Sequence, residues 1–158
     1  MKQVLVKIGE IASILCLIVF IGIMTVNGTV SEASLQEVSE NVVSDIDLEG
    51  ALKRDIKQIR KQFGADESEM EDYLYYSCED VMDVRELLII RLAPDCEGDS
   101  FYSAIEKRLD DKRALFESYA PEQSAMLNGA VLVREKGFIF YAVGEDCDEA
   151  YGNFKSSL

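Results

Sequence analysis

The stretch Asp99–Val143 constrains the fold most strongly, because it combines a long helical pattern, a break and a tight hairpin. Apolar residues recur at spacings of mostly three and four as far as Tyr119, which predicts a long helix with one apolar face. Asp99 or Ser100 is the expected N-cap, since either side chain can accept a backbone hydrogen bond. The helix is expected to end near Tyr119, because Pro121 has no N–H and disfavours a helical conformation at the residue before it.

A hairpin is predicted after the break at Asn128-Gly129. Alternating residues predict one strand at 131–134 and another at 138–143, joined by the two-residue turn Lys136-Gly137, where glycine accepts a positive φ without steric cost. The second strand is apolar on both faces, which favours a central position in a sheet.

The remaining segments complete an α+β pattern. Helical spacing predicts further helices at 35–46, 48–63 and 147–154, with Gly64 as a C-cap signal after the second. Two further strands are predicted at 70–78 and 84–92. The order α-α-β-β-α-β-β-α therefore predicts an antiparallel sheet of about four strands, covered by helices on one face.

The N-terminus carries a separate signal, an uncharged run of 21 residues from Ile11 to Ser31. About 20 such residues suffice to cross a bilayer as a helix. Lys2 and Lys7 precede the run and acidic residues follow it, so the positive-inside rule places the N-terminus in the cytoplasm. We expect a single-pass cell-membrane protein with an anchor at 1–28, a spacer at 29–34 and an extracytoplasmic domain at 35–158. The alternative is a signal peptide cleaved after Gly28, which would give a secreted protein.

The charge narrows the choice of partner. Outside Lys2, Lys7 and Glu10 the chain has 14 basic and 29 acidic residues, a net charge of −15. Such a domain is repelled by nucleic acid and by anionic lipid surfaces, so no nucleic-acid partner is expected. The charge either attracts cations or a basic partner, or serves only solubility.

The chain shows no catalytic constellation and predicts no cofactor. It contains no histidine, which excludes Ser-His-Asp and Cys-His nucleophile systems, and its glycines form no phosphate-binding loop. A glycosidase with two carboxylates stays formally possible, although no carboxylate stands out at an otherwise apolar position. Acidic loops could bind Ca²⁺ if they gathered at one end of the sheet. The weak candidate ligands are Asp95, Glu97, Asp99, Asp146 and Asp148.

Three cysteines, Cys78, Cys96 and Cys147, lie in the predicted exported part. One disulfide with a free thiol, or three reduced thiols, fits this odd number. Tyr73 and Tyr75 belong to a tyrosine-rich strand that forms either a carbohydrate or peptide platform or ordinary cross-strand packing.

Residues 84–144 resemble a bacterial family catalogued as domain of unknown function 4358 (DUF4358), more loosely back to Leu48, with a family-like core at about 48–156. The resemblance is carried by Val84-Arg85-Glu86-Leu87, Phe116-Glu117-Ser118-Tyr119-Ala120-Pro121-Glu122-Gln123, Leu127-Asn128-Gly129-Ala130-Val131 and Lys136-Gly137-Phe138. It implies an exported, membrane-anchored protein or lipoprotein of the Gram-positive cell envelope, and it assigns no activity. This chain departs from the pattern because Leu15 precedes Cys16, where a lipoprotein signal needs a small residue.

Together these features predict a non-enzymatic, membrane-anchored domain that binds an envelope protein or a cell-wall component. The alternative is a small envelope hydrolase or carbohydrate-active module that uses the acidic loops. The candidate binding residues are Tyr73, Tyr75, Tyr119, Pro121, Gln123 and Asn128.

Overall fold

The computed structural model describes residues 13–14, 30–44, 46–64 and 66–158. The chain divides into two units, Met1–Ser31 and Glu32–Leu158, and the second contains the sheet. The predicted anchor at 1–28 lies outside the described residues except for Ser13 and Ile14. Among the helices that the structure describes, none has the length and hydropathy needed to cross a bilayer.

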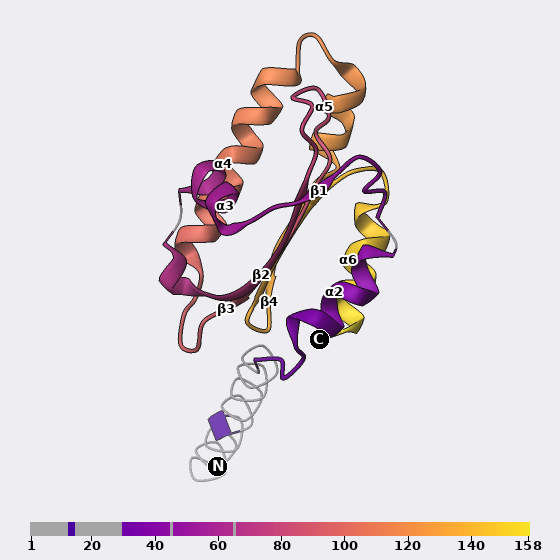
Figure 1. Cartoon of the computed structure of the whole chain (residues 1–158). Helices are drawn as coiled ribbons and strands as arrows, with labels where there is room; N and C mark the ends of the chain where they lie inside the picture. Colours follow the sequence, from indigo (N-terminus) through magenta and orange to yellow (C-terminus); the bar gives the residue numbers. More distant parts are fainter. Residues whose placement is uncertain (1–12, 15–29, 45, 65) are drawn as a thin grey trace, which may run out of the picture. The chain divides into compact units, whose positions relative to one another are not determined.

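The second unit is an α+β domain with one antiparallel sheet (Figure 1). Its strands are β1 (Leu52–Lys53), β2 (Met70–Ser77), β3 (Glu86–Leu92), β4 (Val131–Glu135) and β5 (Phe138–Val143). Its helices are α2 (Leu35–Val43), α3 (Ile56–Phe63), the 3₁₀ turn η1 (Glu67–Glu69), α4 (Asp99–Phe116), α5 (Pro121–Asn128) and α6 (Cys147–Ser156). The strand order is β1-β2-β3-β5-β4, and every neighbouring pair is antiparallel.

Strand β1, which was not predicted, replaces the first part of the predicted helix at 48–63. Leu52 and Lys53 pair with the end of β2, and the Arg54 N–H donates to the Tyr75 carbonyl at 2.7 Å. The helix begins only after Asp55, whose side chain accepts a hydrogen bond from the backbone N–H of Gln58. An apolar residue every three or four positions does not distinguish one long helix from a strand followed by a short helix. The stop signal was correct, since Gly64 is left-handed with φ 62°.

The helices cover both faces of the sheet, whereas one covered face was predicted (Figure 1). Buried residues of α3, α4 and α5 pack with Leu88, Ile90 and Ile139 on one face, and those of α2 and α6 pack with Leu87 and Ile89 on the other. The physical reason lies in β3 and β5, whose residues are apolar on both sides. Two apolar faces need two layers of helix to exclude water.

The predicted hairpin is confirmed. Lys136 and Gly137 both have positive φ, 48° and 85°, and connect β4 to β5. Strand β5 lies between β3 and β4 and is buried along its whole length, as its two apolar faces indicated.

The long predicted helix needs two corrections. Helix α4 begins at Asp99 after a left-handed Gly98, with no side-chain cap, and it ends at Phe116. Pro121 then begins α5, where its missing N–H would have had no helical partner.

Candidate functional site

One end of the sheet carries several polar side chains that are held by hydrogen bonds and ion pairs. The strand register aligns Ser77 with Glu86 and Glu86 with Val143, so β2 and β5 end where β3 begins. We call this the loop end: it carries the β2–β3 loop (78–85), the α4–α5 connection (117–120) and the turn after β5 (144–146). Three pockets open here, and each is lined by residues of one or more of these loops or of the adjoining helices.

A carboxylate lies in the core beneath the loop end. Glu86, the first residue of β3, is 1% exposed. Its Oε1 accepts from the Tyr75 hydroxyl and from Arg108 Nη2, both at 2.7 Å. Its Oε2 accepts from Lys112 Nζ at 2.7 Å and from the Tyr141 hydroxyl at 3.3 Å. Two strands and one helix are therefore joined to β3 through a single side chain, and we call these five residues the Glu86 cluster.

The cluster holds Glu86 in its ionised form. Burial alone would raise the pKa of Glu86, but the charges of Lys112 and Arg108 outweigh it and lower the pKa below its ordinary value. Burial and the neighbouring carboxylate raise the pKa of Tyr75 and of Tyr141, so both phenols keep the protons that they donate. The buried charge is therefore paired, and the removal of either side would leave an uncompensated charge in the core.

Sequence reasoning missed this cluster and found no carboxylate at an apolar position. Glu86 directly precedes the run Leu87–Leu92, so it resembled the polar end of a loop. One signal was available. Arg108 and Lys112 are four residues apart and share one face of α4, and that face is the one turned to the core.

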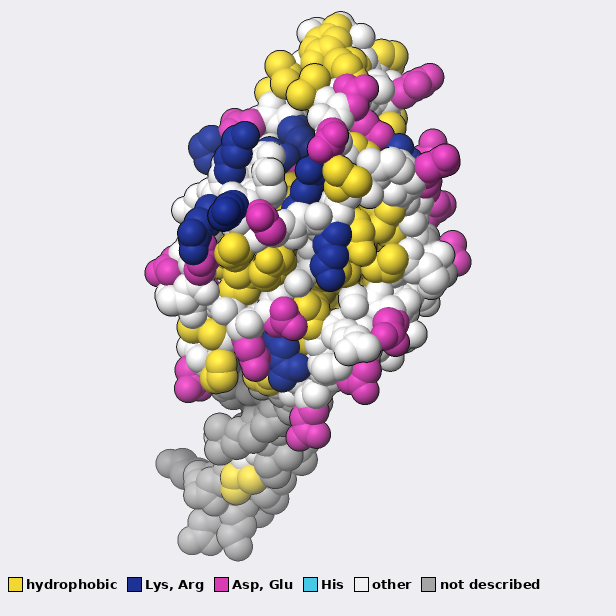
Figure 2. Space-filling view, in the orientation of Figure 1, with side chains coloured by type: hydrophobic (Ala, Val, Ile, Leu, Met, Phe, Trp, Pro, Cys, Tyr) yellow, Lys and Arg dark blue, Asp and Glu magenta, His cyan; other side chains and the backbone are white. Residues whose placement is uncertain are grey.

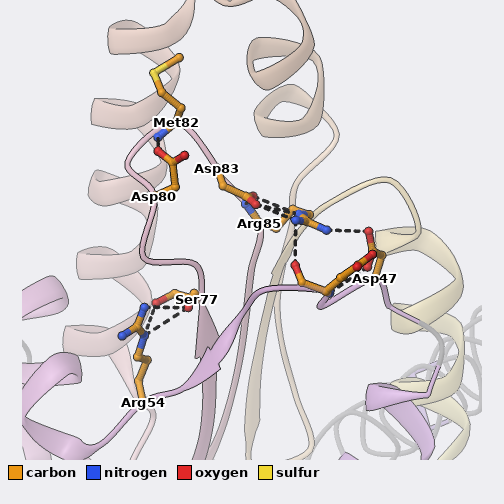
Figure 3. A network of polar contacts seen from close by, with 8 residues as sticks. Asp47, Arg54, Ser77, Asp80, Met82, Asp83 and Arg85 are labelled. Carbon is orange, nitrogen blue, oxygen red and sulfur yellow. Dashed lines mark hydrogen bonds and ion pairs between the residues drawn. The ribbon is translucent and has the colours of Figure 1, made fainter.

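Beside the core cluster lies a more exposed network around Arg85 (Figure 3). Its guanidinium contacts Asp83 Oδ2 at 2.6 Å, Asp47 Oδ2 at 2.6 Å and the Glu49 carbonyl at 2.9 Å. The Arg85 hydrogen bonds are the largest cause that lowers the pKa of Asp83, to about 2. The network ties the segment before β1 to the β2–β3 loop.

Arg54 fixes the same loop from the side of β1 (Figure 3). Its Nε donates to Ser77 Oγ at 2.9 Å and its Nη2 donates to the Ser77 carbonyl at 2.9 Å. Asp80 Oδ1 accepts from the Met82 N–H at 2.9 Å and closes the turn of the loop. The loop is thus held at both ends and at its tip.

Two adjoining pockets form a groove with many carboxylates. The first, of about 420 Å³, is lined by Asp47, Asp80, Met82, Asp83, Arg85, Gln123, Met126 and Glu145. The second, of about 560 Å³, is lined by Glu122, Ala125, Met126, Gly129, Gly144, Glu145, Cys147 and Asp148. Met126 and Glu145 belong to both linings, so we treat the two pockets as one surface and call it the acidic groove.

Large apolar side chains are exposed in and beside the groove. Their exposed fractions are 84% for Val81, 60% for Leu115, 53% for Tyr119 and 42% for Met82. Val81 and Leu115 line a third pocket of about 310 Å³ together with Phe116, and the Tyr119 ring lies 5.5 Å from the Phe116 ring. We call these four residues the apolar tip. Figure 2 shows hydrophobic side chains gathered at the end of the domain where α4 and α5 meet.

The structure separates the predicted binding residues into two groups. Gln123 lines the acidic groove, Tyr119 belongs to the apolar tip, and the exposed Pro121 and Asn128 are the first and last residues of α5. Tyr73 and Tyr75 instead pack into the core on the α4 face of β2. Because the Tyr75 hydroxyl is taken by Glu86, this strand forms cross-strand packing there and offers no Tyr75 surface.

The acidic loops do not all gather at one end. Strand β3 runs from the loop end to Leu92, so the loop with Asp95, Glu97 and Asp99 lies at the opposite end from Asp146 and Asp148. Asp99 pairs with Arg134 at 2.5 Å. Within the described part of the chain, no group of three His, Cys, Asp or Glu side chains could hold a metal ion.

Cys78, Cys96 and Cys147 are free thiols in the structure. Cys78 lies at the loop end and Cys96 at the opposite end of the sheet, which keeps these two apart. Burial raises the pKa of Cys78 and that of Cys147 to about 11. Both thiols therefore stay protonated near neutral pH and are poor nucleophiles.

Comparison with known proteins identifies one family. Residues 44–144, more than half of the chain, match the family described as Domain of unknown function (DUF4358). No curated protein matches the chain, and no solved structure matches it. The matched segment contains the Glu86 cluster, the Arg85 network and the apolar tip. The chain is a member of the DUF4358 family.

Proposed function

We propose that this protein is a non-enzymatic binding domain, held at the outer face of the cell membrane by its N-terminal segment, which contacts an envelope protein or cell-wall component through the loop end. The observation that carries the proposal is the apolar tip beside the acidic groove. Single exposed apolar side chains are normal on a protein surface, but a contiguous group marks an interaction site more often than chance.

The tip is supported by rigid structure, as a binding surface requires. Val81 and Met82 belong to a loop fixed by Arg85, Arg54 and Asp80. Leu115 lies one residue before the end of α4, the helix anchored to Glu86. A surface held in one conformation before binding loses less entropy when it binds.

The charge states at the loop end favour binding over acid–base chemistry. A general acid that works near neutral pH needs a carboxyl whose pKa is raised. The pKa of Asp83 and the pKa of Glu86 are both lowered. These two carboxylates are already paired with cations, so their charges support structure.

Site-specific photo-crosslinking in intact cells tests the proposal. A photoreactive amino acid replaces Leu115 in the full chain, and a matched control places it at Lys136, which is exposed in the turn at the opposite end of the sheet. We expect a discrete adduct from position 115 that Val81→Ser weakens. Equal adduct patterns at the two positions would count against the loop end as the binding surface.

The proposed location at the membrane has a separate test. The intact mass of the protein isolated from its native cells, compared with the mass calculated from the sequence, shows whether residues 1–28 remain attached. We expect a full-length protein in the membrane fraction. A soluble protein that lacks these residues would instead identify a secreted domain.

A further inference from the structure

We propose that the acidic groove binds a basic segment of a protein partner, whose Lys or Arg side chains pair with the groove carboxylates while an apolar side chain packs on Met82 and Met126. This inference rests on the proposed binding function and specifies the chemistry of the partner.

The groove has more carboxylates than Arg85 pairs with. Arg85 pairs with Asp47 and Asp83, each at 2.6 Å, and so accounts for two of the six carboxylates. The other four take part in none of the ion pairs found among the described residues; they are Asp80, Glu122, Glu145 and Asp148. All four are exposed, so they can pair with incoming cations without a large desolvation cost.

The apolar part of the groove favours a peptide over a simple cation. Met126 is shared by both pockets, and Met82 adds a second thioether at one wall, with 42% of its surface exposed. Methionine is flexible and polarisable, so it adapts to side chains of different shape. Volumes of about 420 and 560 Å³ lie within the roughly 300–1,000 Å³ typical of ligand pockets.

Charge complementarity sets the sign of the partner. The chain carries −14, and the lining of the second pocket contributes three carboxylates and, among the described residues, no Lys or Arg. A polyanion would be repelled from such a surface, whereas a basic segment would be steered toward it and would bind less tightly as salt increases.

The test is a fluorescence-anisotropy titration of the full chain in detergent micelles. The probe is a labelled 12-residue peptide that contains Lys and Leu, and it is compared with two matched peptides in which Glu replaces Lys or Ser replaces Leu. We expect binding of the Lys/Leu peptide only. Its affinity should fall as salt rises from 50 to 150 mM, because added salt shortens the Debye length, to about 8 Å at 150 mM.

Two double variants with the same change in net charge locate the site. Asp80→Asn with Glu145→Gln removes two groove carboxylates, and the control Glu32→Gln with Glu40→Gln removes two exposed carboxylates that lie outside the groove lining. We expect the groove variant to bind about five- to tenfold more weakly and the control to stay within about twofold. Met126→Ser should also weaken the Lys/Leu peptide, because it removes apolar contact without a change in charge. Thermal melting confirms that each variant folds.

Three outcomes would overturn the inference. Equal loss in the two double variants would mean unspecific attraction by net charge. Competition by spermine as strong as that by the peptide, with no dependence on Leu, would indicate a site for small cations. Absence of peptide binding while the adduct from position 115 persists would reject the basic partner and keep the proposed function. If neither peptide binding nor that adduct is observed, the proposed function is rejected as well.

Discussion

Arg85 and Glu86 are neighbours in sequence, yet they stand at the centres of two opposite charge arrangements. Glu86 is one buried carboxylate between two cations, Arg108 and Lys112. Arg85 is one cation between two carboxylates, and its side chain is 22% exposed. Each centre forms two ion pairs, so we expect their burial, and not the number of ion pairs, to determine how much each contributes to stability. A charge that cannot reach water costs far more when its partner is removed than one that can.

The largest expected effect is the loss of the charge on Glu86. Glu86→Gln keeps the size of the side chain but leaves Arg108 and Lys112 without an anion, and these side chains are only 20% and 18% exposed. We expect the free energy of unfolding to fall by about 3 kcal/mol. Urea denaturation monitored by circular dichroism measures it.

A triple variant sharpens this result. Replacing Glu86, Arg108 and Lys112 together by Met removes the charges on both sides, so it should cost less than Glu86→Gln alone. If the triple variant is the less stable of the two, then packing and hydrogen bonds to the tyrosines, rather than unpaired charge, dominate the cluster.

The second effect is a loss of stability in acid. The folded pKa of Glu86 lies below its ordinary 4.5, and that of Asp83 falls from 3.8 to about 2. The unfolded chain therefore binds more protons than the folded one in this range, so both groups add stability above pH 4.5 and lose it as the pH falls toward 2. Urea midpoints measured between pH 7 and 2.5 should fall, and Glu86→Gln should flatten that dependence. An unchanged slope in the variant would assign the effect to other carboxyls.

The third effect is smaller and local. Arg85→Met removes the ion pairs to Asp83 and Asp47 and the bond to the Glu49 carbonyl. Because the carboxylates left behind, Asp83 and Asp47, are 25% and 56% exposed, we expect a loss of roughly 1–2 kcal/mol. Hydrogen exchange should rise in the loop 78–85 more than in β3. Uniform exchange across the sheet would show that Arg85 supports the core and not only the loop.

The smallest effect comes from a surface pair on the same helix as the buried cluster. Lys107 and Asp111 are in contact at 2.6 Å, but their side chains are 76% and 68% exposed. Lys107→Met should change the free energy of unfolding by less than about 0.5 kcal/mol. Lys112→Met, five residues along α4, should cost clearly more because it unbalances Glu86. Urea denaturation measures both changes in the free energy of unfolding. Similar values for the two lysines would contradict the expected difference between exposed and buried ion pairs.

The sequence by itself determined the local structure wherever one residue type imposes one conformation. Gly64 stops α3, Lys136-Gly137 forms the hairpin turn, and the two apolar faces of 138–143 place β5 inside the sheet. These features depend on backbone sterics and on period-two burial, which are readable from neighbouring residues. The family was also evident from its motifs and is shown by the match over 44–144.

Tertiary structure decided what depends on partners distant in sequence. Whether 52–53 forms a strand or part of a helix was settled by pairing with β2, about 25 residues away. The direction of β3 placed the acidic loop at 95–99 away from the other acidic loops, and the second layer of helices followed from closure of both sheet faces. The Glu86 cluster brings together residues as distant as Tyr75 and Tyr141. Burial is a property of the folded chain. Only the folded structure shows that Glu86, at the start of β3, is a buried charge that contacts β2, β5 and α4.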